Sequence, residues 1–223
     1  MLRGSPVALV HNGLHGGITI FSLLHWLMIL GKVLSSKHPD CRTQHQMYKA
    51  LYENALIPEI VEEQTKFSAE IIFNTGEMAD FGNKIPPEKV LEAPKVVRFK
   101  CEPHELFTIL LTDFDAPSRD GPYNREWLYW AVGNCKANNH VDDVHLIAPM
   151  LPIHPDKGTG YHRFVFYVYK QPNDTRIDFK EFFLNNTEAV KKNGRNNFDV
   201  KEFARNYKLG DIYALNFFLS ERA

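Results

Sequence analysis

Short apolar stretches separated by turn-forming residues run through most of the chain and predict β-strands. Residues 106–112 (LFTILLT) predict a strand whose odd positions are apolar and share a face with Asp113 at its end. Residues 127–133 (WLYWAVG) and 163–169 (RFVFYVY) are apolar on both faces, which is typical of strands covered on both sides. Three shorter β-prone stretches are expected at residues 67–73, 95–99 and 212–219. Because Gly, Pro and Asn separate these segments, the pattern predicts a mainly β domain, either a β-sandwich or a related fold.

Two segments carry the signals of peripheral helices. Residues 48–56 place apolar side chains on one face and end before a proline. Nearer the C-terminus, Asp199 is suited to cap a helix, with Glu202 three residues later and Gly210 to end it.

The first 46 residues form an N-terminal extension that differs from the expected domain at residues 47–223. The run Ile18–Leu30 is apolar but shorter than the about 20 residues that a membrane-spanning helix needs. It suits the centre of a signal peptide, which would make the protein secreted, or an anchor. Two alternatives stay open: translation starts at Met47, which would leave a cytoplasmic protein, or the run is a structural helix.

The overall composition is that of a globular protein. Apolar residues make up 44% and charged residues 24%, and 26 Lys and Arg against 27 Asp and Glu give a net charge of −1. A protein that neutralises nucleic-acid phosphates normally carries a basic surplus, so nucleic acid is not an expected partner. The three cysteines are Cys41, Cys101 and Cys135, and their spacing fits neither a disulfide framework nor a zinc site. We expect unreactive thiols, with a Cys101–Cys135 bridge as the alternative.

Two polar stretches next to predicted strands are candidates for chemistry. Residues 113–119 (DFDAPSR) follow the strand at 106–112, and either form a turn in which Arg119 pairs with Asp115 or offer Asp113 as an acceptor for a histidine or a ligand hydroxyl. Residues 157–163 (KGTGYHR) lead into another strand, where glycines expose backbone N–H groups that can bind an anion. The glycines precede a strand, so they form no dinucleotide or P-loop signature.

The two stretches, with Arg-Glu-Trp at 125–127 between them, closely resemble the phosphatidylethanolamine-binding protein family, which includes the Raf kinase inhibitor proteins. The resemblance covers roughly residues 50–219. It implies a β-sandwich with Greek-key connections and a few peripheral helices. It also implies a non-enzymatic, monomeric binding protein without metal or cofactor, which recognises a phospholipid head group or another small anion and acts on a kinase or a protease.

The resemblance further implies a small anion pocket between strand ends. The residues at its family positions are Asp113, Pro117, Trp127, Tyr129, His162, Phe164 and Tyr213. In this interpretation, the His162 imidazole donates to a phosphate oxygen, the Asp113 carboxylate orients the ring, and aromatic side chains form the walls.

Four residues of the pocket depart from the family pattern. Tyr129 stands where the family has a second histidine, and Phe164 stands where it has an aromatic hydroxyl. Asp156 and Phe114 each replace a proline, and the backbone at Phe114 is expected to be reshaped. Because two hydrogen-bond donors are lost, we predict a pocket that is weak for phosphate or tuned to another ligand.

Two other functions stay open as alternatives. A hydrolase would use Asp113 and His162 as an acid–base pair. A structural role in a larger assembly, such as that of the related domain in a mitochondrial ribosomal protein, would tolerate a degenerate pocket.

Overall fold

The computed structural model describes residues 42–62, 65–136, 144–181 and 194–222. The run Ile18–Leu30 and Cys41 lie outside them, so the predictions for the N-terminal extension and its boundary at residue 47 remain predictions. Within the described ranges, none of the helices combines the length and apolar character needed to cross a membrane.

The described chain is built mainly from strands. Two α-helices are α2 (Gln44–Glu53) and α4 (Val200–Asn206), and 3₁₀ turns occupy Pro87–Lys89 and Pro172–Asp174. The first strands are short: β1 (Phe67–Ser68), β2 (Glu70–Ile72), β3 (Met78–Ala79), β4 (Asn83–Lys84) and β5 (Val96–Arg98). The later strands are mostly longer: β6 (Leu106–Asp113), β7 (Trp127–Lys136), β8 (His145–Ala148), β9 (His162–Lys170) and β10 (Ile212–Ser220).

These strands form two sheets within the described residues. The large, seven-stranded sheet has the order β1-β10-β9-β6-β7-β8, with β4 also pairing with β10, and the small sheet has the order β3-β2-β5. Strands β6 to β9 pair antiparallel in the spatial order β9-β6-β7-β8, which is the order of a Greek key. The predicted β-sandwich with peripheral helices is therefore confirmed.

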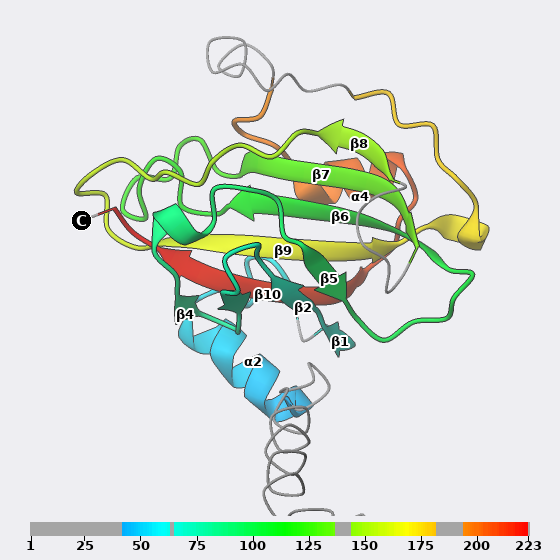
Figure 1. The fold of residues 1–223 in the computed structure, drawn as a ribbon, viewed down its shortest axis with the longest axis horizontal. Coiled ribbons are helices and arrows are strands. Elements are labelled where there is room, and N and C mark those ends of the chain that lie inside the picture. Colours follow the sequence, from blue (N-terminus) through cyan, green and yellow to red (C-terminus); the bar gives the residue numbers. More distant parts are fainter. Residues whose placement is uncertain (1–41, 63–64, 137–143, 182–193, 223) are drawn as a thin grey trace, which may run out of the picture. The chain divides into compact units, whose positions relative to one another are not determined.

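The large sheet is covered on both faces, which explains its uniformly apolar strands. Phe107, Ile109 and Leu111 of β6 pack into a core shared with the small sheet, whereas Leu110 packs into a second core shared with α2 and α4. In Figure 1 the small sheet lies in front of the large one and α4 lies behind it. Successive side chains of a strand point to opposite faces, so each long strand contributes to both cores.

The segment predicted as one strand at 67–73 is divided between the two sheets. Its first part, β1, runs parallel to β10, and its second part, β2, belongs to the small sheet. Ala69 lies at the change, where its N–H donates to the Leu215 carbonyl at 3.1 Å. The buried Asn216 amide donates to the Ala69 carbonyl at 2.6 Å and accepts from the Phe81 N–H at 2.9 Å.

Helix α2 begins four residues before the predicted helix because of a capping box. The Thr43 hydroxyl accepts from the Gln46 N–H at 3.2 Å, and the Gln46 side chain accepts from the Thr43 N–H at 2.8 Å. Met47 therefore lies inside the helix, and its side chain is buried.

Helix α4 has the predicted N-cap. The Asp199 carboxylate accepts from the Glu202 N–H at 2.7 Å. The helix ends at Asn206, earlier than expected, and Lys208 adopts a left-handed conformation with φ of 54°.

Candidate functional site

Two strand ends bring Asp113 and His162 together on the face of the large sheet that faces the small sheet. Asp113 is the last residue of β6 and His162 is the first residue of β9, and Asp113 lies opposite Phe164 in the antiparallel pair. The Nδ1 atom of His162 lies 2.7 Å from Oδ2 of Asp113, and both residues are only 2% exposed. Ligand binding by these two residues remains a prediction, but the structure shows that they meet.

Both ring nitrogens of His162 are engaged within the protein. Its Nε2 atom lies 2.9 Å from the Thr159 hydroxyl, which donates to the Asp156 carbonyl at 2.6 Å. A hydroxyl has one proton to donate, so Thr159 accepts from Nε2–H of His162. With Nδ1–H assigned as the donor to the Asp113 carboxylate, both ring nitrogens carry protons and His162 is assigned as an imidazolium.

The electrostatic environment agrees with a charged His162. Burial alone would lower its pKa, but the hydrogen bond and charge of Asp113, with further carboxylates at Asp115 and Asp156, raise the pKa of His162 above its ordinary value. The Asp113 carboxylate in turn accepts the Asp115 N–H at 2.8 Å through its other oxygen. Both carboxylate oxygens and both ring nitrogens of the pair therefore have partners within the protein.

A second ion pair fixes the turn after β6. Asp115 is fully buried, and its Oδ2 accepts from the Arg163 backbone N–H at 2.9 Å and from Nε at 2.8 Å, while Oδ1 pairs with Nη2 of Arg163. Burial raises the pKa of Asp115, but the Arg163 contacts outweigh it and hold the pKa below its usual value. The predicted Arg119–Asp115 pair is wrong: Arg119 is exposed and contacts the Asn54 carbonyl at 3.4 Å.

Aromatic side chains surround the His162–Asp113 pair. The Phe164 ring is stacked on the His162 ring with centroids 6.3 Å apart, and it meets the Tyr129 ring edge-on at 5.3 Å. Trp127, the first residue of β7, lies opposite Asp113 in the sheet. Burial and the carboxylates of Asp113 and Asp156 raise the pKa of Tyr129, so its hydroxyl stays neutral.

The loop before β9 brings a negative charge to this site. Asp156 is exposed and close enough to raise the pKa of both His162 and Tyr129. Gly158 and Gly160 have positive φ values of 80° and 77°, which is why glycines flank Thr159. The Thr159 N–H donates to the Asp156 carbonyl at 3.3 Å, so it is not available to an anion as a backbone cradle would require.

The position of Tyr213 corrects one expectation. Tyr213 does not share this site: β10 runs antiparallel to β9, with Ser220 opposite His162 and Ile212 opposite Tyr169, so Tyr213 lies at the far end of the strand. There it packs on Phe67 and donates to the Lys100 carbonyl at 2.9 Å.

The peptide bonds around Phe114 and Pro117 bear on the expectation of a reshaped corner at Phe114. Among the described residues the cis peptide bonds are Ile57-Pro58, Ala116-Pro117 and Arg125-Glu126, so none lies at Phe114. The Phe114 side chain is buried, and the guanidinium groups of Arg125 and Arg163 lie 4.0 Å and 4.8 Å from its ring centroid.

The cysteines do not form the alternative bridge. Cys101 and Cys135, both within the described ranges, are thiols. Burial, with a smaller contribution from the charges of Glu105 and Glu102, raises the pKa of Cys101 to about 11. Burial raises the pKa of Cys135 to about 12. The described part of the chain has no group of three His, Cys, Asp or Glu side chains arranged to hold a metal ion.

Three polar residues of structural importance were missed by sequence reasoning. Thr159 and Arg163 lie in the stretch 157–163 that was expected to carry chemistry. Its pattern did not indicate that Thr159 contacts His162 or that Arg163 pairs with Asp115. Glu126 lies on the opposite face of the sheet, where its Oε2 accepts from the Thr112 and Tyr167 hydroxyls at 2.5 Å and 2.6 Å. A signal was present in the alternation of β6, which directs Thr112 and Asp113 to opposite faces.

The Asp113–His162–Thr159 chain has the connectivity of a catalytic triad but not its proton arrangement. In a triad, the hydroxyl proton is given to the imidazole. Here the Thr159 hydroxyl donates to the Asp156 carbonyl instead, and both ring nitrogens of His162 are engaged. The arrangement is therefore suited to fixing a loop on a strand end rather than to activating a nucleophile.

Comparison with known proteins agrees with this architecture. The family model described as phosphatidylethanolamine-binding protein matches residues 75–218. A relative in Drosophila melanogaster, named "Putative odorant-binding protein A5", is 27% identical over 194 residues, which covers 87% of this chain and 88% of the relative.

Two solved structures share the fold. The carboxypeptidase Y inhibitor, solved in complex with its cognate proteinase, superposes with a TM-score of 0.67 at 19% identity and covers 82% of this chain and 98% of the inhibitor. The phosphatidylethanolamine-binding protein of Plasmodium vivax gives a TM-score of 0.66 at 19% identity, with 79% and 97% covered. At this identity the likeness concerns the fold.

Proposed function

The chain belongs to the phosphatidylethanolamine-binding protein family, and from this premise we propose that it is a non-enzymatic binding protein whose site beside His162 has low affinity for phosphate. The observation that carries the proposal is the engagement of both His162 ring nitrogens, by Asp113 at 2.7 Å and by Thr159 at 2.9 Å. A phosphate would have to displace one of these partners to receive a hydrogen bond from the imidazolium. The exposed Asp156 carboxylate beside the site adds repulsion.

The ligand that suits this site is a small organic molecule with a weakly polar head. Tyr129 keeps a neutral hydroxyl, and the Phe164 ring offers apolar surface where the family has a hydroxyl. The name of the Drosophila melanogaster relative, which refers to odorants, supports a small-molecule ligand over a phospholipid. Such sites combine apolar walls with a few fixed polar groups.

Isothermal titration calorimetry with O-phosphoethanolamine tests the proposal. For the wild-type chain we expect a dissociation constant of about 1 mM or weaker, near −4 kcal/mol. The double variant Tyr129→His and Phe164→Tyr restores two donors and should bind about ten- to a hundredfold more tightly. The matched control is Tyr161→Phe, an exposed tyrosine two residues before Arg163 that rests on Lys84 and should leave binding unchanged. Micromolar binding by the wild-type chain would refute the proposal.

Inhibition of a peptidase is a second candidate function. The observation that favours it is the fold shared with the carboxypeptidase Y inhibitor, whose structure was solved with its cognate proteinase. A carboxypeptidase assay with the full chain at micromolar concentration tests it. Undiminished peptidase activity would reject this candidate and leave the small-ligand proposal in place.

A further inference from the structure

A cavity lies against α4, on the face of the large sheet opposite His162. Its volume is about 370 Å³, and its walls include Glu126, Tyr167, Tyr169, Phe198, Asp199 and Ile212. Neither Asp113 nor His162 lines it, because the intervening sheet separates the two faces. We call it the α4 cavity.

Glu126 presents one unused carboxylate oxygen in this cavity. Its Oε2 accepts from two neutral hydroxyls, Thr112 at 2.5 Å and Tyr167 at 2.6 Å. Its Oε1 has no hydrogen bond or ion pair among the described residues, and it is not fully enclosed by protein, so it retains contact with solvent. The carboxylate is thus held in place by its neighbours but lacks a cation.

Tyr169 gives a second, independent indication of a ligand. The residue is only 3% exposed and lines the α4 cavity, yet within the described chain its hydroxyl has no hydrogen-bond partner. The ring is buried, but the hydroxyl is not among the enclosed polar atoms, so it opens into the cavity, where a bound polar group can take the place of water as its partner.

The charges around the cavity favour a cation. Three carboxylates line it, those of Glu59, Glu126 and Asp199, against the cations Arg125 and Lys201. Arg125 is already shared between Asp115 at 3.4 Å and Glu59 at 3.9 Å. Asp199 pairs with Arg205 at 4.0 Å, so among the described residues Glu126 is the lining carboxylate without an ion pair.

We propose that the α4 cavity is a second binding site, which takes the protonated amino group of a small organic amine between Glu126 Oε1 and the Tyr169 hydroxyl. The ammonium group supplies the missing counter-charge, and its N–H groups have two oxygen acceptors. Aromatic rings in the wall suit a cation as well, since the face of an aromatic ring attracts positive charge.

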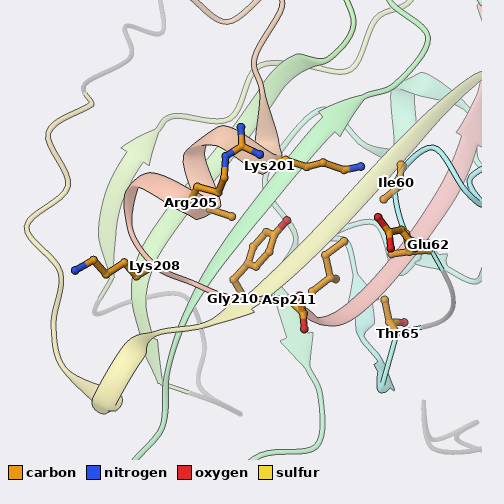
Figure 2. A pocket seen from close by; sticks show the side chains of 12 residues that line it. Ile60, Glu62, Thr65, Lys201, Arg205, Lys208, Gly210 and Asp211 are labelled. Carbon is orange, nitrogen blue, oxygen red and sulfur yellow. The ribbon is translucent and has the colours of Figure 1, made fainter.

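An adjoining, larger cavity offers space for the apolar body of the amine. Its volume is about 740 Å³, and Ile60, Tyr169, Lys201 and Ile212 line both cavities. Figure 2 shows this larger cavity, with Lys201 reaching from α4 toward Ile60 while Lys208 points away. The apolar side chains along the shared wall can cover an aryl or alkyl group.

The titration of Glu126 supplies a readout of binding. Burial raises the pKa of Glu126 to about 7, against the hydrogen bonds from Thr112 and Tyr167 and the nearby charge of Arg125. The charge of Asp199 also raises the pKa of Glu126. Burial and the charge of Glu126 raise the pKa of Tyr169, so its hydroxyl stays neutral. An amine binds the ionised form, so its binding should release protons near pH 7 and become tighter as the pH rises from 6 to 8.

Calorimetry of the full chain with 2-phenylethylamine tests the site, with 2-phenylethanol and 3-phenylpropanoate as uncharged and anionic probes of similar shape. At pH 8 we expect the amine alone to bind, with a dissociation constant of about 1 mM or tighter. Binding at pH 6 should be about tenfold weaker, because a carboxyl with a pKa of about 7 is then largely protonated. The proton release should be measurable in buffers of different ionisation enthalpy.

Variants locate the binding and separate it from folding. Glu126→Gln keeps an acceptor for Thr112 and Tyr167 and should weaken amine binding at least tenfold, with no remaining pH dependence. The matched control Glu202→Gln removes an exposed carboxylate of α4 that lines neither cavity and should change the affinity by less than about twofold. Tyr169→Phe, which deletes only the hydroxyl, should weaken binding about two- to tenfold and serves if Glu126→Gln fails to fold. Absence of amine binding, equal binding of the alcohol, or unchanged affinity in folded Glu126→Gln would each overturn the proposal.

Discussion

The site beside His162 and the α4 cavity differ in how far the protein satisfies its own polar groups. At the first site, Asp113 and Thr159 engage both ring nitrogens of His162, and the Thr159 hydroxyl in turn donates to the Asp156 carbonyl. In the α4 cavity, Glu126 Oε1 and the Tyr169 hydroxyl have no partner within the described chain. The family resemblance therefore points to the site beside His162, whereas these two polar atoms without a partner in the described chain lie in the α4 cavity.

Neighbouring residues of one strand serve the two sites. Asp113 and Thr112 are consecutive in β6 and point to opposite faces, so one contacts His162 and the other Glu126. The end of β6 therefore contributes a residue to each site. Substitutions at Thr112 and Asp113 affect different sites, so their effects can be compared.

The largest expected effect comes from the ion pair that supports the first site. Asp115→Ala leaves the buried Arg163 guanidinium without its carboxylate and should lower the free energy of unfolding by about 3–5 kcal/mol. Urea denaturation followed by circular dichroism measures it. Arg119→Ala, an exposed arginine in the same turn, should change stability by less than about 0.5 kcal/mol. Equal effects of the two variants would contradict the assigned pairing.

The next effect concerns Glu126 in the α4 cavity and the pH dependence of the free energy of unfolding. The folded-state pKa of Glu126, about 7, lies above the ordinary 4.5, so the wild-type chain loses stability as the pH rises through this window, by at most about 3 kcal/mol. Glu126→Gln has no such group, so its stability relative to wild type should increase between pH 5 and pH 7.5. Urea midpoints at the two pH values check this, and a constant difference would show that Glu126 does not titrate there.

A smaller effect is expected on freeing one nitrogen of His162. Thr159→Ala removes the acceptor of Nε2–H, so the imidazolium can donate to a phosphate, and the affinity for O-phosphoethanolamine should rise about tenfold. Calorimetry with the wild-type chain as reference measures it. If affinity does not change, the intramolecular contact of Nε2 is not what limits phosphate binding.

The last prediction is that replacing His162 leaves the rate of ester hydrolysis unchanged. Because both ring nitrogens of His162 are engaged, we do not expect it to act as a base, and His162→Gln should hydrolyse p-nitrophenyl acetate at the wild-type background rate. A wild-type rate that exceeds the variant's by tenfold or more would revive the hydrolase alternative.

The sequence predicted the long strands well and the short ones poorly. Uniformly apolar β6 and β9 were predicted within one residue of each end because burial on both faces leaves an unmistakable pattern. Two-residue strands such as β3 and β4 are defined by pairing with distant segments, so no local pattern reveals them. The division of residues 67–73 between two sheets was missed for the same reason.

The sequence predicted the Asp113–His162 contact of the candidate site but assigned Tyr213 to it wrongly. The family resemblance implied one pocket for Asp113 and His162, and the structure joins them. Tyr213 was assigned to the site by family position alone, whereas the antiparallel register of β10 carries it to the other end of the strand. The partners of Glu126 come from separate strands, so only the folded chain brings them together.

The contacts of Asn216 have a consequence for the order of folding during synthesis. This residue, in the last strand, holds the carbonyls of Ala69 and Ala79 and the N–H of Phe81, which were translated more than a hundred residues before it. Long-range pairing of this kind is slow and comes late. The early segment must therefore wait, incompletely bonded, until the C-terminal strand has left the ribosome.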